Sequence, residues 1–507
     1  MPSTEPYRTS IGELVSQTAA ARGGDVAVVS VRSDGSQQAM TWRELERQGN
    51  AAVHALAALG VTADTPVAVA LPAGLEHVVT TIGAFKLGAL VVPLDDHAAE
   101  RETAALTSLL GEHVLIGPMP RATAPGGWWR DRDWPADPPA PVGTPRSASL
   151  TGGTTGLPRV VLRRRPWTYP PDALLADADR ERGLRLGQVQ LVVLPMHHAG
   201  FSALYQGLAL GHKVVVMERF VARRLPKLVV EHRVNYLRIV PALMRMVLQV
   251  PELADYDFSS VEAVHHSAAP CPEQVKRGWL ELVGPDRVYE EYASQERLGS
   301  VMIRGDEWLA HPGSVGRPTQ CDLRIRGEDG RWLPPGEVGE VYVGGRQPAY
   351  VGGGQQLPEQ DGYLTVGDLG YLDRDGYLYL VGRTSNVINV GGANVYPAEV
   401  EAVLLRLDGV ADAVAVGRPH AYLGETVHAL VVPSDPAHPV TQAALEAHCR
   451  RHLSAAKLPM SYELTAGPLR ERNGKVRRSS TVQPEPPSAG AGAGQPAGVP
   501  TVGADPV

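Results

Sequence analysis

The first part of the chain carries apolar residues at helical spacing directly after a helix-start signal. Residues 41–44 read Thr-Trp-Arg-Glu, which is the order of a capping box. Leu45 and Leu56 follow on one helical face, and Gly60 ends the pattern. The pattern predicts a helix over residues 41–59.

Strand and helix patterns then alternate over the next two hundred residues. Short apolar runs predict strands, and amphipathic stretches between them predict helices. The predicted elements are strands at 66–71 and 89–94 around a helix through Lys86, strands at 191–194, 214–217 and 236–240, a helix at 221–231 and a helix opened by Pro241. Such alternation is typical of layered α/β sheets. The fold class expected is therefore α/β.

The pattern changes after residue 322 to short strands separated by turn residues. Asp-Gly and Pro-Gly pairs at 329–330, 335–336 and 375–376 predict tight turns and a β-rich subdomain. A smaller α+β unit follows, with strands near 410–416 and 427–432 and a helix near 442–453. The stretch 118–145, rich in Pro, Gly and Trp, is interpreted as a surface connection.

These patterns divide the chain into three parts. We expect a large N-terminal domain over residues 1–384 and a small C-terminal domain over 385–482. Residues 483–507 are mainly Pro, Gly and Ala and hold too few bulky apolar groups to offset the entropy of ordering, so a disordered tail is expected.

Composition narrows the class of partner. The chain has 507 residues, of which 43% are apolar, so several domains can be filled. Its formal charge is 48 − 55 = −7 and it has no long basic run, which argues against nucleic acid or an anionic membrane as the main partner. Three separated cysteines, no signal-peptide pattern and no run of about 18 apolar residues favour a cytoplasmic protein acting on a small molecule.

Several short motifs carry groups that suit a nucleotide. Residues 151–159 read TGGTTGLPR, a loop whose N–H groups and hydroxyls can face phosphate, although an ordinary flexible loop is the alternative in a chain with 54 glycines. It is not a Walker loop, because Leu-Pro stands where Lys-Ser/Thr is required. Asp368 and Arg383 can each hold ribose hydroxyls, and Gly391 and Gly392 let the backbone approach a thin ligand.

Other motifs follow predicted strands. Residues 195–200 read PMHHAG, residues 267–270 read SAAP and residues 292–296 read YASQE. The two adjacent histidine pairs, at 197–198 and 265–266, lack a third ligand at suitable spacing, so zinc is not expected.

Taken in this order, the motifs resemble those of the adenylate-forming superfamily of acyl-CoA synthetases, adenylation domains and luciferases, in its acyl- or aryl-CoA ligase branch. The resemblance implies that ATP is bound by Thr151, Gly152, Gly153, Thr154, Thr155, Gly156, Ser267, Ala268, Ala269, Pro270, Tyr292, Gln295, Asp368 and Arg383. Within this set Tyr292 stacks on adenine, and Gln295 replaces a threonine that contacts the α-phosphate. Glu296 is expected to hold Mg²⁺.

The resemblance also implies a moving small domain. Lys475, one of only six lysines and part of Asn-Gly-Lys, matches the adenylation lysine. Ser385 occupies the hinge, where Asp or Lys is usual, and Gly391 and Gly392 would line the path of CoA. The expected catalytic residues are Lys475, Glu296, Thr154 and the gate residue His198.

The expected activity is ATP-dependent ligation of a carboxylic acid to CoA through an acyl adenylate, with ATP, Mg²⁺ and CoA as cofactor and co-substrates. Ala199 stands where amino-acid-activating relatives carry Asp, so we expect a bulky aryl or polycyclic acid without a free α-amine, used in bacterial secondary metabolism or degradation. Transfer to a carrier protein or an amine is the alternative. A second alternative is a degenerate nucleotide-binding protein, because Arg159, Gln295, Val366 and Ser385 all depart from the family pattern.

Overall fold

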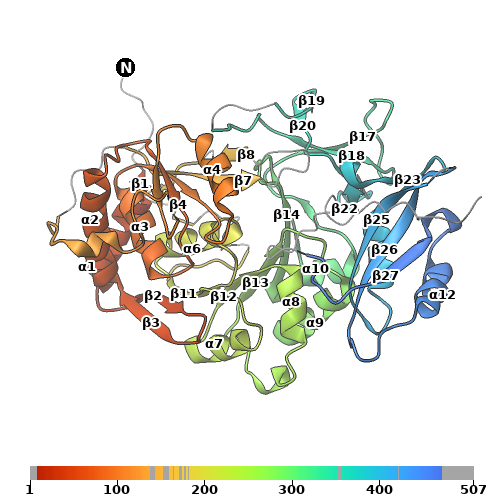
Figure 1. Cartoon of the computed structure of the whole chain (residues 1–507), viewed down its shortest axis with the longest axis horizontal. Coiled ribbons are helices and arrows are strands. Elements are labelled where there is room, and N and C mark those ends of the chain that lie inside the picture. Colours follow the sequence, from red (N-terminus) through yellow and green to blue (C-terminus); the bar gives the residue numbers. More distant parts are fainter. Residues whose placement is uncertain are drawn as a thin grey trace, which may run out of the picture.

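The computed structural model describes residues 8–119, 121–137, 143–151, 159–163, 165–170, 174–175, 179–180, 182–351, 356–420 and 422–470. Figure 1 shows the N-terminal elements at one end of the molecule and the sheet of β23 to β27 at the other. Within the described part of the chain, no helix combines the length and the apolar character needed to cross a bilayer.

The N-terminal layers consist of helices packed on a mostly parallel sheet. The helices are α1 (Ile11–Arg22), α2 (Trp42–Ala58), α3 (Leu75–Lys86) and α4 (Glu100–Ser108). The sheet has the order β6-β4-β5-β7-β8, with β4 (Pro66–Val69), β5 (Leu90–Pro93), β6 (Val114–Ile116), β7 (Arg146–Thr151) and β8 (Arg159–Leu162). Thr41 and Glu44 form the predicted capping box at the start of α2. A short ribbon of β1 (Thr9–Ser10) and β9 (Thr168–Tyr169) lies beside these layers.

A second, larger sheet forms the centre of the molecule. Its order is β16-β15-β14-β13-β12-β10-β11-β2-β3, and β2, β11, β10, β12, β13 and β14 run parallel. The bounds are β2 (Val26–Val31), β3 (Gln37–Thr41), β10 (Val189–Val192), β11 (Lys213–Met217), β12 (Tyr236–Ile239), β13 (Ala263–Ser267), β14 (Val288–Ala293), β15 (Ser300–Arg304) and β16 (Arg317–Pro318). Parallel strands place their carboxyl ends at one edge, so the segments after β10, β13 and β14 meet there.

Helices connect these strands and cover the sheet. They are α6 (Ala199–Ala209), α7 (Arg224–His232), α8 (Pro241–Leu248), α9 (Glu273–Val283) and α10 (Gly305–Ala310). One apolar core joins α6 and the N-terminal helices, and a second joins α7, α8 and α9. The α/β prediction is confirmed.

The β-rich subdomain follows the large sheet along the chain and precedes the C-terminal elements. It contains β17 (Leu323–Arg326), β18 (Gly339–Gly344), β19 (Glu359–Gln360), β20 (Tyr363–Leu364), β21 (Asp368–Leu372) and β22 (Leu378–Arg383). Strands β21 and β22 form an antiparallel hairpin, and Gly376 in its turn has a φ of +81°, as the Asp-Gly pair predicted.

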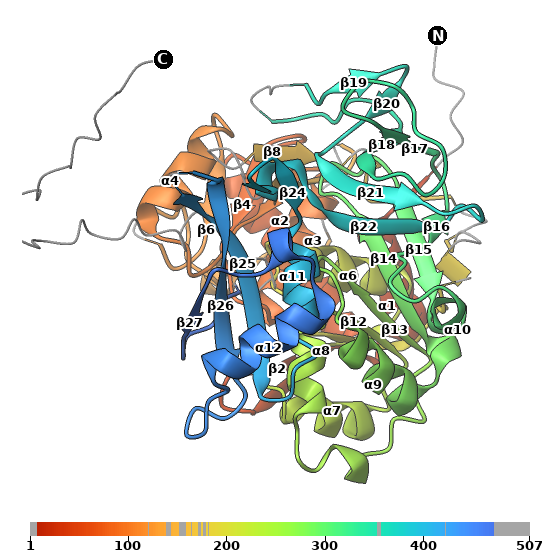
Figure 2. The same ribbon diagram turned by 90° about the vertical axis from the view of Figure 1, so that its right-hand side faces the viewer.

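The C-terminal elements form their own sheet, of order β24-β23-β26-β25 with β27 beside β26, and their own apolar core. The bounds are β23 (Ile388–Val390), β24 (Ala393–Val395), β25 (Val410–His420), β26 (Gly424–Pro433), β27 (Ser461–Leu464), α11 (Pro397–Leu404) and α12 (Gln442–His452). Figure 2 shows both helices on one side of this sheet. The boundary at 384/385 stays a prediction, and the predicted tail lies outside the described residues.

Three details differ from the sequence prediction. Trp129, in the stretch interpreted as a surface connection, is only 2% exposed, because its ring joins the core beneath the N-terminal helices. Strand β10 ends at Val192, although the buried apolar run continues to Leu194. Helix α7 begins at Arg224, three residues later than predicted. In β10, therefore, the buried apolar run is longer than the paired strand.

Candidate active site

The expected ribose contacts lie on adjacent strands and bind each other. Asp368 and Arg383 are paired in register at one end of the β21–β22 hairpin. Arg383 Nε donates to Asp368 Oδ1 at 2.7 Å, and the Tyr292 hydroxyl donates to Asp368 Oδ2 at 2.7 Å. The structure therefore brings together three predicted site residues from the large sheet and the β-rich subdomain.

These two contacts fix the orientation of the Asp368 carboxylate, whose oxygens can accept further hydrogen bonds. The carboxylate is buried, and among the described residues each oxygen accepts one hydrogen bond, although its lone pairs allow two. Burial, and then the negative charge of Asp368, raise the pKa of Tyr292 well above its ordinary value. Tyr292 is therefore a donor at neutral pH, and two fixed donors hold the carboxylate for a hydroxyl-bearing ligand.

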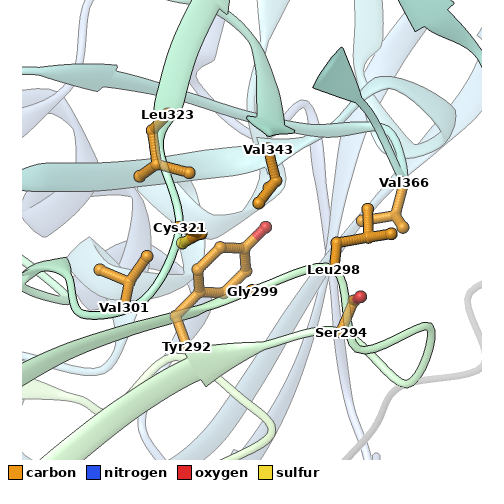
Figure 3. Close-up of a pocket in the computed structure, with 9 residues that line it drawn as sticks. All are labelled: Tyr292, Ser294, Leu298, Gly299, Val301, Cys321, Leu323, Val343 and Val366. Atoms are coloured by element: carbon orange, nitrogen blue, oxygen red, sulfur yellow. The ribbon is translucent and has the colours of Figure 1, made fainter. Parts of the chain in front are cut away.

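A small apolar cavity adjoins Tyr292, as Figure 3 shows. Its volume is about 10 Å³, which is room for about one water molecule and not for a nucleobase. Its lining residues are Tyr292, Ser294, Leu298, Gly299, Val301, Cys321, Leu323, Val343 and Val366. Val366, which departs from the family's usual threonine, thus contributes to this apolar lining. A nucleotide has to lie outside this cavity.

Two strand ends carry the predicted adenine and phosphate segments. Ser267 is the last residue of β13 and pairs in register with Glu291 of the neighbouring strand β14. The segments 267–270 and 292–296 therefore begin side by side. Ala268 has a φ of +77°, a conformation that costs a non-glycine residue of order 1 kcal/mol and that is frequent at functional sites.

Glu296 and Arg159, at the end of the predicted phosphate loop, both lie close to Tyr350, a residue that no sequence motif indicated. The Arg159 guanidinium lies over the Tyr350 ring, 5.8 Å from its centroid. Burial, and then the charge of Glu296, raise the pKa of Tyr350. Val161 of β8 forms a bridge with Tyr350, so backbone pairing brings the two segments together. Local sequence gives no signal for such a long-range pairing.

A single carboxylate at Glu296 is compatible with a magnesium ion that is bound mainly by the phosphates of the nucleotide. In the described residues, no cluster of three or more His, Cys, Asp or Glu side chains is placed to hold a metal. Mg²⁺ at nucleotide sites commonly takes one or two protein carboxylates and completes its shell with phosphate oxygens and water. One glutamate beside the phosphate loop is compatible with that mode of binding.

His198 precedes α6 and is partly buried, and its ring lies against that of His197 with centroids 4.2 Å apart. His197 Nε2 lies 3.8 Å from Asp95 Oδ2, in the segment after β5. The histidine pair therefore lies where the two large sheets meet. His198 lies between β10 and α6, and its role as a gate stays a prediction.

The remaining predicted residues lie elsewhere or are not described. Ser385 lies in a 3₁₀ turn (Thr384–Asn386) two residues after Arg383. Gly391 and Gly392, with φ of +58° and +86°, form the turn between β23 and β24 and contact Leu423 and Asn389. Thr151 is the last residue of β7. Gly152, Gly153, Thr154, Thr155, Gly156 and Lys475 lie outside the described residues.

The contacts among Asp368, Arg383 and Tyr292 lie where the large sheet meets the β-rich subdomain, and a separate C-terminal sheet follows. The AMP-binding enzyme family matches residues 15–350, and the AMP-binding enzyme C-terminal domain matches residues 399–475. The chain belongs to this family, and the resemblance to the adenylate-forming superfamily is confirmed.

Similar proteins agree with this assignment. The fatty acid–[acyl-carrier-protein] ligase ScoC of Streptomyces coeruleorubidus is 31% identical, over 87% of this chain and 90% of ScoC. The long-chain-fatty-acid–CoA ligase FadD13 of Mycobacterium tuberculosis is 29% identical, over 87% and 92%. The solved o-succinylbenzoate CoA synthetase of Bacillus subtilis superposes with a TM-score of 0.79 at 24% identity, over 94% of this chain and 99% of that one. The prediction of an acid ligase is confirmed at this level.

Proposed function

We propose that this chain is an ATP-dependent carboxylic acid:CoA ligase acting in the cytoplasm on a bulky aryl or polycyclic acid. The observation that supports the nucleotide part is the Asp368 carboxylate, which Arg383 and Tyr292 hold and which has no third hydrogen-bond donor among the described residues. The thiol acceptor rests on the likeness to named CoA ligases.

In the first half-reaction the acid's carboxylate attacks the α-phosphate of ATP and pyrophosphate leaves. The attacking oxygen is already anionic, so charge neutralisation rather than a general base is required. Glu296 would hold Mg²⁺, which neutralises phosphate charge when bound. Gln295 and Lys475 would donate to the α-phosphate, and Asp368 would hold the ribose. His198 would lie beside the acid.

In the second half-reaction the CoA thiol displaces AMP from the acyl adenylate. The small domain would turn about Ser385, and the Gly391–Gly392 turn would then line the path of the CoA arm. Transfer to a carrier protein is the competing acceptor, and the likeness to ScoC favours testing it directly.

The test is a panel of carboxylic acids assayed for ATP-dependent AMP release with CoA, with a phosphopantetheinylated carrier protein, and with neither. We expect thioester on CoA, and amino acids slower by at least about 100-fold, since Ala199 provides no carboxylate to pair with an ammonium and a buried unpaired charge costs several kcal/mol. Asp368→Asn should lose activity, whereas Arg331→Gln, on an exposed turn, should not.

Two results would contradict the proposal. Thioester formed on the carrier protein and not on CoA would show that the acceptor is a carrier protein. AMP release that no acid stimulates would instead favour a protein that binds nucleotide without ligase activity.

A further inference from the structure

Four arginine side chains lie close together between the large sheet, the start of α6 and the end of β8. We call Arg163, Arg182, Arg238 and Arg297 the arginine cluster. Arg182 Nη1 lies 3.4 Å from Glu291 Oε1, and Arg238 Nη2 lies 3.2 Å from Glu291 Oε2. The single carboxylate of Glu291 is therefore shared by two of the four guanidinium groups.

Arg163 has a buried donor without a partner. Its guanidinium packs on the Trp167 ring at 3.6 Å from the centroid. Its Nη1 atom is inaccessible to solvent and, among the described residues, has no hydrogen-bond partner. The Tyr169 hydroxyl is also buried and has no hydrogen-bond partner among the described residues. Burial raises its pKa to about 12, although the charge of Arg163 acts to lower it. A buried unsatisfied donor is costly, and a charged one more so.

Arg297 connects the cluster to the candidate active site. It directly follows Glu296, and its Nη2 donates to Ser202 Oγ at 3.3 Å, in the first turn of α6 after His198. The side chain is accessible, yet burial of its guanidinium by the surrounding protein, and then the charge of Arg238, lower its pKa. Its guanidinium therefore lies beside the first turn of α6.

Among the described residues, arginines outnumber carboxylates around the cluster. Arg165 also acts on Arg163, which makes five guanidinium groups. Against them, the carboxylates of Glu291 and Asp179 act on this part of the sheet. Positive charge that is partly buried and only partly paired is unfavourable unless a bound anion compensates it.

We infer that the arginine cluster binds a second anionic group of the acid substrate, so that the preferred substrates are acids with a carboxylate or sulfonate remote from the reacting carboxylate. This inference rests on the proposed function, because it places the acid between His198 and Arg297. A guanidinium binds such a group through paired, charge-assisted hydrogen bonds. The cluster would then set specificity, and the nucleotide groups would perform the chemistry.

The test compares dicarboxylic acids with their own monomethyl esters. Suitable pairs are 4-carboxycinnamate, naphthalene-2,6-dicarboxylate and suberate, each with its monoester. Activity is measured as acid-dependent pyrophosphate release, which needs no CoA, so the result is independent of the thiol acceptor. We expect the diacid to have the higher kcat/KM in every pair that the enzyme uses.

Arg297→Gln should lower the diacid-to-monoester ratio of kcat/KM by about 10- to 100-fold, which is the range for one hydrogen bond to a charged group. Arg163→Met, which keeps an apolar side chain on Trp167, should lower the ratio in the same direction. Thermal unfolding of both variants shows whether they fold. The exposed Arg331→Gln is the matched control and should leave the ratio unchanged.

Three results would overturn the inference. One is a preference for monoesters in the parent enzyme. Another is an equal loss of diacid and monoester turnover in Arg297→Gln, which would mean that the cluster serves the reacting carboxylate or the phosphates. The third is the absence of pyrophosphate release with every acid, which would overturn the proposed function as well. AMP release without a CoA thioester would change only the acceptor.

Discussion

At the scale of single residues, Asp368 shows what a sequence motif predicts and what it leaves open. The motif indicated that Asp368 and Arg383 are both ribose contacts, and this role stays a prediction. It did not indicate that the two side chains bind each other or that Tyr292 donates to the same carboxylate. These contacts depend on the register of the β21–β22 hairpin and on its position against β14, and neither is a local property of the sequence.

Tyr350 and the arginine cluster were missed for the same physical reason. Arg163 and Arg297 are far apart in the sequence, and each by itself is typical of an ordinary surface residue. Their proximity appears only when the strands are assembled, where Arg297 lowers the pKa of Arg163 further than burial alone does. Function encoded in such long-range clusters is invisible to motif analysis.

Glu291→Gln is predicted to destabilise the fold in a pH-dependent way. Burial acts to raise the Glu291 pKa, but Arg238 and then Arg182 hold it below the ordinary value of 4.5. The carboxylate thus stabilises the fold above about pH 4.5, and this contribution is lost as pH falls through the lowered pKa. Urea unfolding should show a loss of about 3–5 kcal/mol at pH 7 that shrinks below pH 4.5.

The exposed pair of Glu273 and Arg277 offers the control for this experiment. Glu273→Gln should change stability by less than about 1 kcal/mol, because the pair is solvent-screened. A Glu291→Gln penalty that stays constant between pH 7 and pH 3.5 would show that packing, rather than charge, explains the effect.

At the scale of elements, predictions succeeded where the signal is local. The capping box of α2 and the Asp-Gly turn between β21 and β22 use residues a few positions apart, and both are present. The burial of Trp129 was not predicted, and the start of α7 was placed three residues too early, because each depends on what the rest of the chain packs against that segment.

Gly392→Ala is predicted to weaken the β23–β24 hairpin. The added methyl group would meet no atom within 4 Å, so the φ of +86° is the only source of strain. An alanine there costs about 1–2 kcal/mol, which should speed amide exchange of the hairpin roughly 5- to 30-fold. Gly24→Ala is the control, since that site is equally open and has no left-handed φ. Equal exchange rates in the Gly392 variant and the parent would contradict this prediction.

At the scale of the whole molecule, the order of strands in the large sheet could not be predicted. The sequence indicated alternating strands and helices, but β2 pairs with β11 and belongs to a different sheet from β4. The contact between the two units was equally hidden. Arg245 of α8 donates to the Ala411 carbonyl of β25, and Asp412 next to it binds Arg470, on the segment that leads toward Lys475.

Ser385→Pro is predicted to separate the two half-reactions. Proline fixes φ near −65° and removes torsional freedom at the proposed hinge. Single-turnover assays should show adenylate formation close to that of the parent and thioester formation slowed at least about tenfold. Ser385→Asp restores the usual family residue and should support both steps. Equal slowing of both steps by proline would refute the hinge.

The junction after β22 has a further mechanical consequence. The Thr384 N–H donates to the Gly367 carbonyl at 2.8 Å, so the ladder that holds Asp368 and Arg383 ends one residue before Ser385. For a rotation about Ser385, a ribose on Asp368 lies near the axis and is displaced little. In such a rotation, the far end of the C-terminal sheet would move much further, because it lies far from the axis. A nucleotide bound in one position would thus serve both proposed half-reactions.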